Sequence, residues 1–258
     1  MTSPQEYLLA ITTAGTIEDV WALHVARMAE YGFDGLLYAS TKFRSGHNLG
    51  DIDDAFVLSN QPEVFTKAYL QGGLYRDAPM VRWAMDNVGI LSWSKIIGWA
   101  KTGQLSPGEE KVVAFNAQHN VRVGFGIAFR NATFRSGAGI GLSTSTLTQD
   151  EVDDLLAERG DELELANTVM HLAVSALPRR GLLTERQREA LRLIAEGKSS
   201  KDAATVMEVS VSMVEKHLRD ARERLNVDTT PQAVAKAALQ HQVLWYPDGT
   251  DGTPAPRV

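Results

Sequence analysis

Residues 210–225 read SVSMVEKHLRDARERL, and this stretch decides how the C-terminal part of the chain folds. Apolar residues recur along it at helical spacing and form one stripe: Val214, Leu218, Ala221 and Leu225. Polar residues crowd the opposite side of the same helix: Ser212, Glu215, Lys216, Arg219 and Arg222. The pattern predicts a helix that packs through one face and reaches outward with the other.

A second, shorter helix is predicted directly upstream, over residues 201–207, where small residues allow close packing. Glu208 and Val209 form the turn, and the Ser210 hydroxyl can accept the backbone N–H groups that open the next helix. Two helices joined by so tight a turn suggest a helix-turn-helix.

Two further helices complete a four-helix unit of about the smallest size that folds alone. The first opens with a capping box over residues 184–187 and can end at Gly197 in a left-handed conformation. Its inward stripe consists of Ala190, Leu191, Ile194 and Ala195. The last helix begins with a cap at Thr230 followed by Pro231. It presents Val234, Ala237 and Ala238 to the bundle.

These residues also carry a family resemblance, over roughly the last third of the chain. The matching motifs are Leu183-Thr184-x-Arg186, Ala195-x-Gly197-Lys198-Ser199, Ala203-Ala204, Ser210-x-x-x-Val214-x-x-His217 and Arg224-Leu225-x-Val227. Together they resemble the LuxR-type DNA-binding domain. Gln187 and Met213 stand where Glu and Thr are common in that family, and neither alters the core stripe.

The resemblance implies a transcriptional regulator whose outward helix face enters the major groove of double-stranded DNA. Glu215, Lys216 and Arg219 are expected nearest the bases, because Lys and Arg suit guanine acceptors and Glu accepts from cytosine. The candidates for phosphate contacts are Thr184, Lys201, Ser210, Ser212, His217, Arg222 and Arg224. For each charge the competing interpretation is a solvated helix face.

Charge is divided unevenly along the chain, whose overall net charge is -6. Residues 179–241 carry twelve Lys and Arg against nine Asp and Glu, whereas residues 1–178 carry thirteen against twenty-one. The acidic balance therefore does not count against DNA binding. A net charge of +3 on one small domain is modest, so tight binding should need two copies. We expect a homodimer on an inverted repeat, with RNA polymerase as a candidate further partner.

Composition limits the remaining classes of function. The 258 residues leave room for two ordinary domains, and the absence of cysteine excludes disulfides, thiolate metal sites and thiol nucleophiles. No apolar run approaches the roughly 20 residues that span a bilayer, and the N-terminus lacks a basic region followed by an apolar one. These features predict a soluble, cytoplasmic protein without a membrane partner.

The N-terminal part is predicted as an α/β/α sandwich around a five-stranded, mainly antiparallel sheet. Strands are expected over residues 33–40, 55–59, 89–94 (with Trp93), 121–129 and 137–145. Helices are expected over residues 16–32 (inner face Val20, Leu23, His24, Arg27 and Met28), 62–72, 79–87, 106–119 and 148–177. A polar loop is expected over residues 41–54. The domains then run over residues 1–175 (ligand sensing), 176–182 (linker), 183–246 (DNA binding) and 247–258 (disordered tail).

This first region resembles, more weakly, the signal-binding domain of the same LuxR-type quorum-sensing family. The resemblance implies an autoinducer cavity for an acyl-homoserine lactone between the sheet and one helical layer. The candidate ligand-binding residues are Gln61, Phe65, Tyr69, Asp77, Trp93, Ser143 and Thr144. Three positions depart from the family: Phe65 replaces a Trp whose N–H bonds the ligand, Ala78 replaces an Asp that accepts from it, and Gln61 replaces a Tyr.

Two lost hydrogen bonds would weaken binding of the family's ligand by about a hundredfold or more. We therefore expect an altered acyl-lactone or another small apolar signal; the alternative is a ligand-independent regulator that acts through dimerisation or protein partners. Whether Asp77 replaces the acceptor missing at Ala78 stays open, since it also suits a helix start. The aromatic residues could equally be plain core.

Sequence motifs for catalysis are lacking: there is no Gly-x-Ser-x-Gly elbow, no His-Glu-x-x-His pair and no phosphate loop. The glycines of residues 124–126 and 137–141 lie within strand patterns, so a pocket wall or close backbone packing is favoured over a nucleotide site. We expect no enzyme, no metal and no cofactor. An interaction module that no longer binds DNA and a small-molecule enzyme are the competing classes.

Overall fold

The structure is a computed structural model that describes residues 3–42, 55–130, 136–177 and 183–240. The chain divides into two compact units, residues 1–174 and residues 175–258. The division falls one residue before the predicted end of the sensing domain. Most of the predicted loop over residues 41–54, the last five residues of the predicted linker and the predicted tail lie outside the described residues.

The first unit is built on one antiparallel sheet. Its strands are β1 (Gly35–Thr41), β2 (Phe56–Ser59), β3 (Gly89–Ser92), β4 (Gly124–Ala128) and β5 (Gly137–Ser143). Their order across the sheet is β2-β1-β5-β4-β3, and all four pairings are antiparallel. The prediction of a five-stranded, mainly antiparallel sheet is confirmed.

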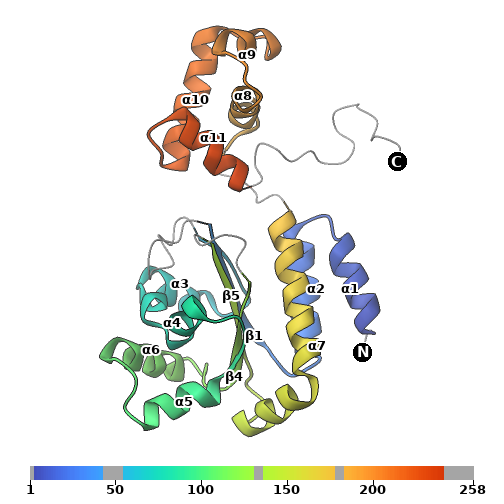
Figure 1. Ribbon diagram of the computed structural model, residues 1–258, viewed down its shortest axis with the longest axis vertical. Helices are drawn as coiled ribbons and strands as arrows, with labels where there is room; N and C mark the ends of the chain where they lie inside the picture. Colours follow the sequence, from blue (N-terminus) through green and yellow to red (C-terminus); the bar gives the residue numbers. More distant parts are fainter. Residues whose placement is uncertain (1–2, 43–54, 131–135, 178–182, 241–258) are drawn as a thin grey trace. The chain divides into compact units, whose positions relative to one another are not determined.

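Helices cover both faces of this sheet (Figure 1). One layer consists of α1 (Pro4–Thr13), α2 (Ile17–Ala29) and α7 (Gln149–Ala176). The other consists of α3 (Glu63–Gln71), the 3-10 helix η2 (Leu74–Asp77), α4 (Pro79–Asp86), α5 (Trp93–Lys101) and α6 (Pro107–Gln118). This arrangement confirms the α/β/α sandwich.

The two faces of the sheet differ because side chains alternate along each strand. Tyr38 of β1 is fully buried on the α7 side, where its hydroxyl lies 2.8 Å from His171 Nδ1. Ile140 of β5 pairs with Tyr38 and with Ile127 of β4, so these residues share that face and form the core under α7. The opposite face presents the smaller residues of the same strands.

Two predictions about the helices of this unit are wrong. Trp93 does not continue strand β3, because the Ser92 hydroxyl accepts the Ser94 backbone N–H and caps α5. The strand therefore ends two residues before its predicted end, and helix α5 itself was not predicted. Leu23 does not belong to the buried face of α2, since it is 37% exposed, whereas Ile17, which was not predicted there, is buried. Helix α1, capped by Ser3, was not predicted.

Helix α7 is not continuous, in contrast to the helix predicted over residues 148–177. Arg159 has a non-helical backbone (φ -131°), so two helical segments meet there at a kink. The Glu162 carboxylate holds the kink: it accepts from Arg159 Nη2 at 2.6 Å and from Arg27 Nη2 of α2 at 2.9 Å, and also from the Tyr31 hydroxyl.

A buried chain of hydrogen bonds joins the three helices of this layer. The Tyr7 hydroxyl of α1 lies 2.7 Å from His24 Nδ1 of α2, and His24 Nε2 lies 3.0 Å from Asn167 Oδ1 of α7. His24 is fully buried, and this burial lowers the pKa of its imidazole to about 4. The ring is therefore neutral at pH 7 and serves as a link between helices.

The second unit is the four-helix bundle. It consists of α8 (Glu185–Ala195), α9 (Ser200–Val206), α10 (Val211–Leu225) and α11 (Thr230–Leu239). The predicted stripe of α10 is confirmed, since each of its four members is at most 5% exposed: Val214, Leu218, Ala221 and Leu225. Two details differ: in α8 Leu193 is buried whereas Ala195 is exposed, and α11 is capped by Thr229, one residue before the predicted cap.

Candidate ligand cavity and nucleic-acid interface

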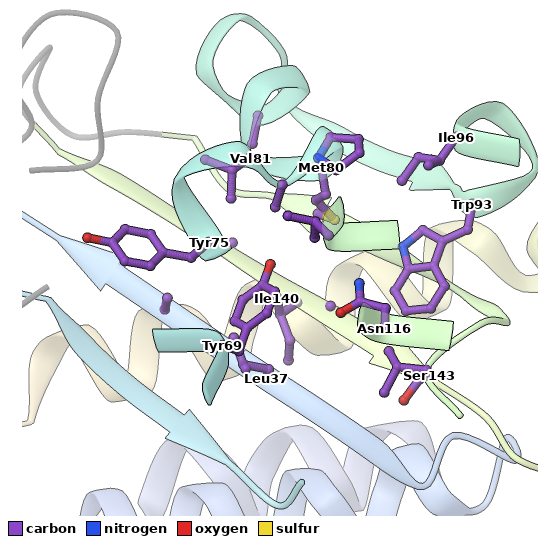
Figure 2. Close-up of a pocket in the computed structure, with 18 of the residues that line it drawn as sticks. Leu37, Tyr69, Tyr75, Met80, Val81, Trp93, Ile96, Asn116, Ile140 and Ser143 are labelled. Atoms are coloured by element: carbon purple, nitrogen blue, oxygen red, sulfur yellow. The ribbon is translucent and has the colours of Figure 1, made fainter. Parts of the chain in front are cut away.

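A cavity of about 520 Å³ lies in the first unit, between the sheet and the layer of α3 to α6. Figure 2 shows side chains from both walls turned toward it. Its lining is mainly apolar: Leu37, Met80, Val81, Ile96 and Val113 are typical members. A volume of this size suits a small organic molecule.

Glycines create the space on the sheet side. Gly139 and Gly141 of β5 pair with Ala39 and Leu37 of β1, so the floor of the cavity carries little side-chain volume. A Cβ atom at Gly141 would meet nothing closer than Trp93 Cζ2, at 3.9 Å. Gly139 and Gly141 therefore belong to the pocket wall, one of the two roles that the sequence pattern indicated. Gly124 and Gly126 have the other role, close packing, since a Cβ atom there would lie 2.0 Å from the Leu142 carbonyl oxygen or 1.6 Å from Met80 Sδ.

Aromatic rings form one end of the cavity. Phe65 stacks on Tyr69 and on Phe115, with ring centroids 5.5 Å apart in both pairs. Phe65 is buried (4% exposed), and burial raises the pKa of the Tyr69 phenol, which stays protonated. Phe65 is thus part of the core and of the cavity lining, whereas the half-buried Tyr69 belongs to the lining.

Gln61 and Ser143 lie together at the base of β1. Gln61 Nε2 donates to Ser143 Oγ at 2.9 Å, and that hydroxyl donates to the Gly35 carbonyl at 3.1 Å. A Cβ at Gly35 would come within 2.2 Å of Gln61 Nε2, so only glycine allows this pair to close over the strand. These two side chains satisfy each other.

Two polar atoms of the lining have no hydrogen-bond partner among the described residues. They are the indole Nε1 of Trp93 and the amide Oδ1 of Asn116, and both are shut off from water. An unpaired buried group of this kind costs about 1–3 kcal/mol. Asn116 was not predicted; its position on the face of α6 that also carries Val112 and Val113 was the available signal.

Two predicted ligand residues are not among the described residues that line the cavity. Asp77 is exposed, and its carboxylate lies beside Gly108 at the start of α6, where the helix dipole favours a negative charge. Thr144 is buried, but its Oγ1 accepts the backbone N–H groups of Thr146 and Leu147 and so shapes the turn before α7. Asp77 does not bring an acceptor to the cavity beside Ala78.

The second candidate site is the outward face of α10. Ser212, Glu215, Lys216 and Arg219 are exposed there, opposite the buried stripe. Ser210 is the N-cap of the helix, accepting the Met213 backbone N–H at 3.2 Å. The structure thus places the predicted base-contacting residues on one solvent-facing row.

The predicted phosphate-contacting residues fall into two groups. Lys201 and Arg224 are exposed, as is Thr184, whose hydroxyl caps α8. His217 is half-buried. Arg222 is also half-buried, and its Nη1 donates to Thr230 Oγ1 at 2.9 Å, so it links α10 to α11.

Within the described residues, no group of three or more His, Asp or Glu side chains is arranged to hold a metal ion. None of the helices in that part of the chain is both long and apolar enough to cross a membrane.

Comparison with known proteins gives matches in both units. The family model "Autoinducer binding domain" matches residues 16–174, and the model "Sigma-70, region 4" matches residues 181–225. The transcriptional activator protein AnoR of Acinetobacter nosocomialis is 23% identical over 252 residues, covering 93% of this chain and 98% of AnoR. The transcriptional activator protein LuxR of Aliivibrio fischeri is 26% identical over 192 residues, covering 72% of this chain and 74% of LuxR.

A solved structure shares the fold of the chain. The crystal structure of Escherichia coli SdiA matches with a TM-score of 0.52 at 16% sequence identity, covering 94% of this chain and 98% of SdiA.

Proposed function

The chain belongs to the family defined by the autoinducer-binding domain, and on that premise we propose that it is a LuxR-type transcriptional regulator controlled by a small, largely apolar signal. The family consists of transcriptional regulators and not of enzymes. The signal occupies the cavity of the first unit, and the second unit binds double-stranded DNA.

One observation carries the DNA-binding part of this proposal: α10 is anchored by its apolar stripe and exposes a polar row on the other side. An α-helix fits the major groove, where Lys216 and Arg219 can donate to guanine and Glu215 can accept from cytosine. Ser212 and Arg224, on the exposed surface of the same helix, suit phosphate contacts that fix the register.

The active form is a homodimer on an inverted repeat. The DNA-binding region carries a net charge of +3, which neutralises few phosphates, so affinity requires a second copy. Leu165 and Leu172 of α7 are 52% and 59% exposed and lie two turns apart on one side of that helix. Such a row of exposed leucines suits an interface with a second α7.

The signal is a small molecule with a long apolar part. The cavity volume of about 520 Å³ lies in the range of ligand sites, and its lining is mostly aliphatic and aromatic. An acyl-homoserine lactone or a related acyl compound fits this description. Binding changes DNA occupancy by favouring the dimer that can reach both half-sites.

The test is selection of DNA by the full-length protein from a random duplex library, followed by fluorescence anisotropy over a salt series. We expect an inverted repeat with half-site centres about 34 Å apart and affinity that falls steeply with salt. The matched variant combines Lys216→Ala with Arg219→Ala and should fold but select nothing. Equal, weak binding to every duplex, even at low salt, would refute DNA recognition.

A further inference from the structure

The polar groups of the cavity divide into satisfied and unsatisfied ones. Gln61 and Ser143 are bonded to each other, and Tyr75 accepts a hydrogen bond from Arg76 Nε at 3.1 Å. In contrast, Trp93 Nε1 and Asn116 Oδ1 are unpaired within the part of the chain that the structure describes. One is a donor and the other an acceptor, so together they suit a ligand group that both accepts and donates.

Helix α6 places Asn116 in the lining of the cavity. It lies one turn beyond Val112 and Val113 on α6, and all three line the cavity. In Figure 2 its amide lies among the cavity-lining side chains, with Trp93 and Tyr69 labelled nearby in the view. If the amide were turned over, its NH₂ group would be the unpaired one, so either orientation leaves a polar atom without a partner.

Charge restricts the ligand further. The described lining contains no Asp or Glu, and its two cationic residues, Lys101 and Arg122, are exposed. A cationic ligand would lose its hydration without gaining a counter-ion, which disfavours amines. A neutral group therefore occupies the region of Trp93 and Asn116.

We propose that Asn116 accepts a hydrogen bond from the N–H of a neutral secondary amide in the ligand, while Trp93 Nε1 donates to a ligand carbonyl oxygen. This inference rests on the proposed function, because it takes the cavity to hold the signal. Both atoms have almost no accessible surface, so the proposed contacts require the Trp93 and Asn116 side chains to rotate toward the cavity when the ligand binds. The acceptor comes from α6, and neither the buried Ala78 nor the outward-facing Asp77 supplies it.

The experiment measures binding of two probes to the full-length protein by isothermal titration calorimetry. One probe is N-octanoyl-homoserine lactone; the other is its ester analogue, in which oxygen replaces the amide N–H. A third probe, the apolar dye N-phenyl-1-naphthylamine, reports on the cavity without requiring either polar contact. The wild type should bind the amide about tenfold or more tightly than the ester, since the ester leaves Asn116 Oδ1 unpaired.

Three variants separate the roles of the two side chains. Asn116→Leu should bind both octanoyl compounds with equal affinity, whereas Asn116→Asp, which keeps an acceptor, should retain the preference for the amide. Trp93→Phe should weaken both compounds alike, by about tenfold, because both carry carbonyl groups. Gln118→Leu is the matched control, since Gln118 is exposed on the same helix and is outside the described lining. If Asn116→Leu does not fold, Asn116→Ala replaces it.

The possible results test the role of Asn116 separately from the proposed function on which it rests. A preference for the amide that survives in Asn116→Leu, or no preference in the wild type, overturns the role of Asn116 and leaves the cavity as a ligand site. Binding of the dye without either octanoyl compound overturns the assignment of a secondary amide. Binding of none of the three probes overturns both the inference and the proposed signal site.

Discussion

Replacing Gly141 by Leu should make the protein more stable while weakening its ligand. Gly141 lies in the floor of the cavity, and its backbone is in a conformation that other residues can adopt. A Cβ atom there has its nearest neighbour, Trp93 Cζ2, 3.9 Å away, so the Cβ itself fits without a clash and the rest of the leucine side chain extends from the cavity floor. The substitution therefore changes the cavity and not the sheet.

The size of both effects follows from the structure. Each of the four added carbon atoms takes up a volume close to that of a water molecule, about 30 Å³, so together they fill roughly a quarter of the cavity of about 520 Å³. Loss of room for even one methylene costs about 1–3 kcal/mol of binding, which corresponds to about a 10- to 200-fold rise in Kd. A strand glycine costs about 0.5–1 kcal/mol, so removing it should raise Tm by about 1–4 °C.

The assay combines dye binding with thermal unfolding. N-phenyl-1-naphthylamine is titrated into the wild type and Gly141→Leu, and both proteins are melted without ligand. Gly139→Ala is the contrasting variant, because its Cβ would lie 2.9 Å from the Ile127 carbonyl oxygen and should lower Tm. Unchanged dye affinity in a stable Gly141→Leu protein would refute the assignment of this cavity as the binding site.

Three further outcomes are expected. Lys216→Ala should relax base preference at one position per half-site, by about 1–3 kcal/mol, whereas Arg224→Ala should lower the affinity for all DNA sequences alike. If Lys216→Ala lowered the affinity for every sequence equally in the same selection, its contact with a base would be contradicted. Leu218→Ala, at a buried position, should lower the free energy of unfolding of the bundle in urea by about 2–5 kcal/mol. Met213→Ala, at an exposed position, should change the same free energy by less than about 0.5 kcal/mol. Similar losses for both variants would argue against the packed stripe. The His24 imidazole is neutral in the folded protein, where its pKa is about 4, whereas its pKa in the unfolded chain is near 6.5. Its contribution to the free energy of unfolding is therefore present at neutral pH and is lost as the pH falls between these values. The loss from pH 7 to pH 5 is about 2 kcal/mol. His24→Gln should flatten this part of the pH dependence of unfolding, and an unaltered profile would assign the loss to other groups.

The bundle could be predicted almost completely from the sequence, because its signals are local. The stripe of α10 and the caps at Ser210 and Thr184 follow from spacing and from side chains that bond within three residues. The same holds for the two strand-forming runs that became β4 and β5. Errors arose where a tertiary contact decided the outcome, as at the kink of α7, where Arg27 and Tyr31 donate to Glu162 from elsewhere in the chain.

The cavity could be predicted only in part. Gln61, Phe65, Tyr69, Trp93 and Ser143 line it, and the resemblance to the signal-binding domain had implied each of them. Asn116 could not be recognised as distinctive, because an asparagine on an amphipathic helix is ordinary until its neighbours in space are known. Asp77 showed the opposite limit: its position next to Ala78 in the sequence did not determine which way its carboxylate faces.

The hydrogen-bonded chain through Tyr7, His24 and Asn167 has a mechanical consequence. Apolar contacts permit a helix to roll about its own axis, but hydrogen bonds between fixed donors and acceptors do not, because they have direction. The segment of α7 after the kink is therefore held in one rotation about its axis, and the direction in which Leu165 and Leu172 point is set by groups on its buried side. If a second copy docks on those leucines, the angle at which the two protomers meet is fixed before any DNA arrives.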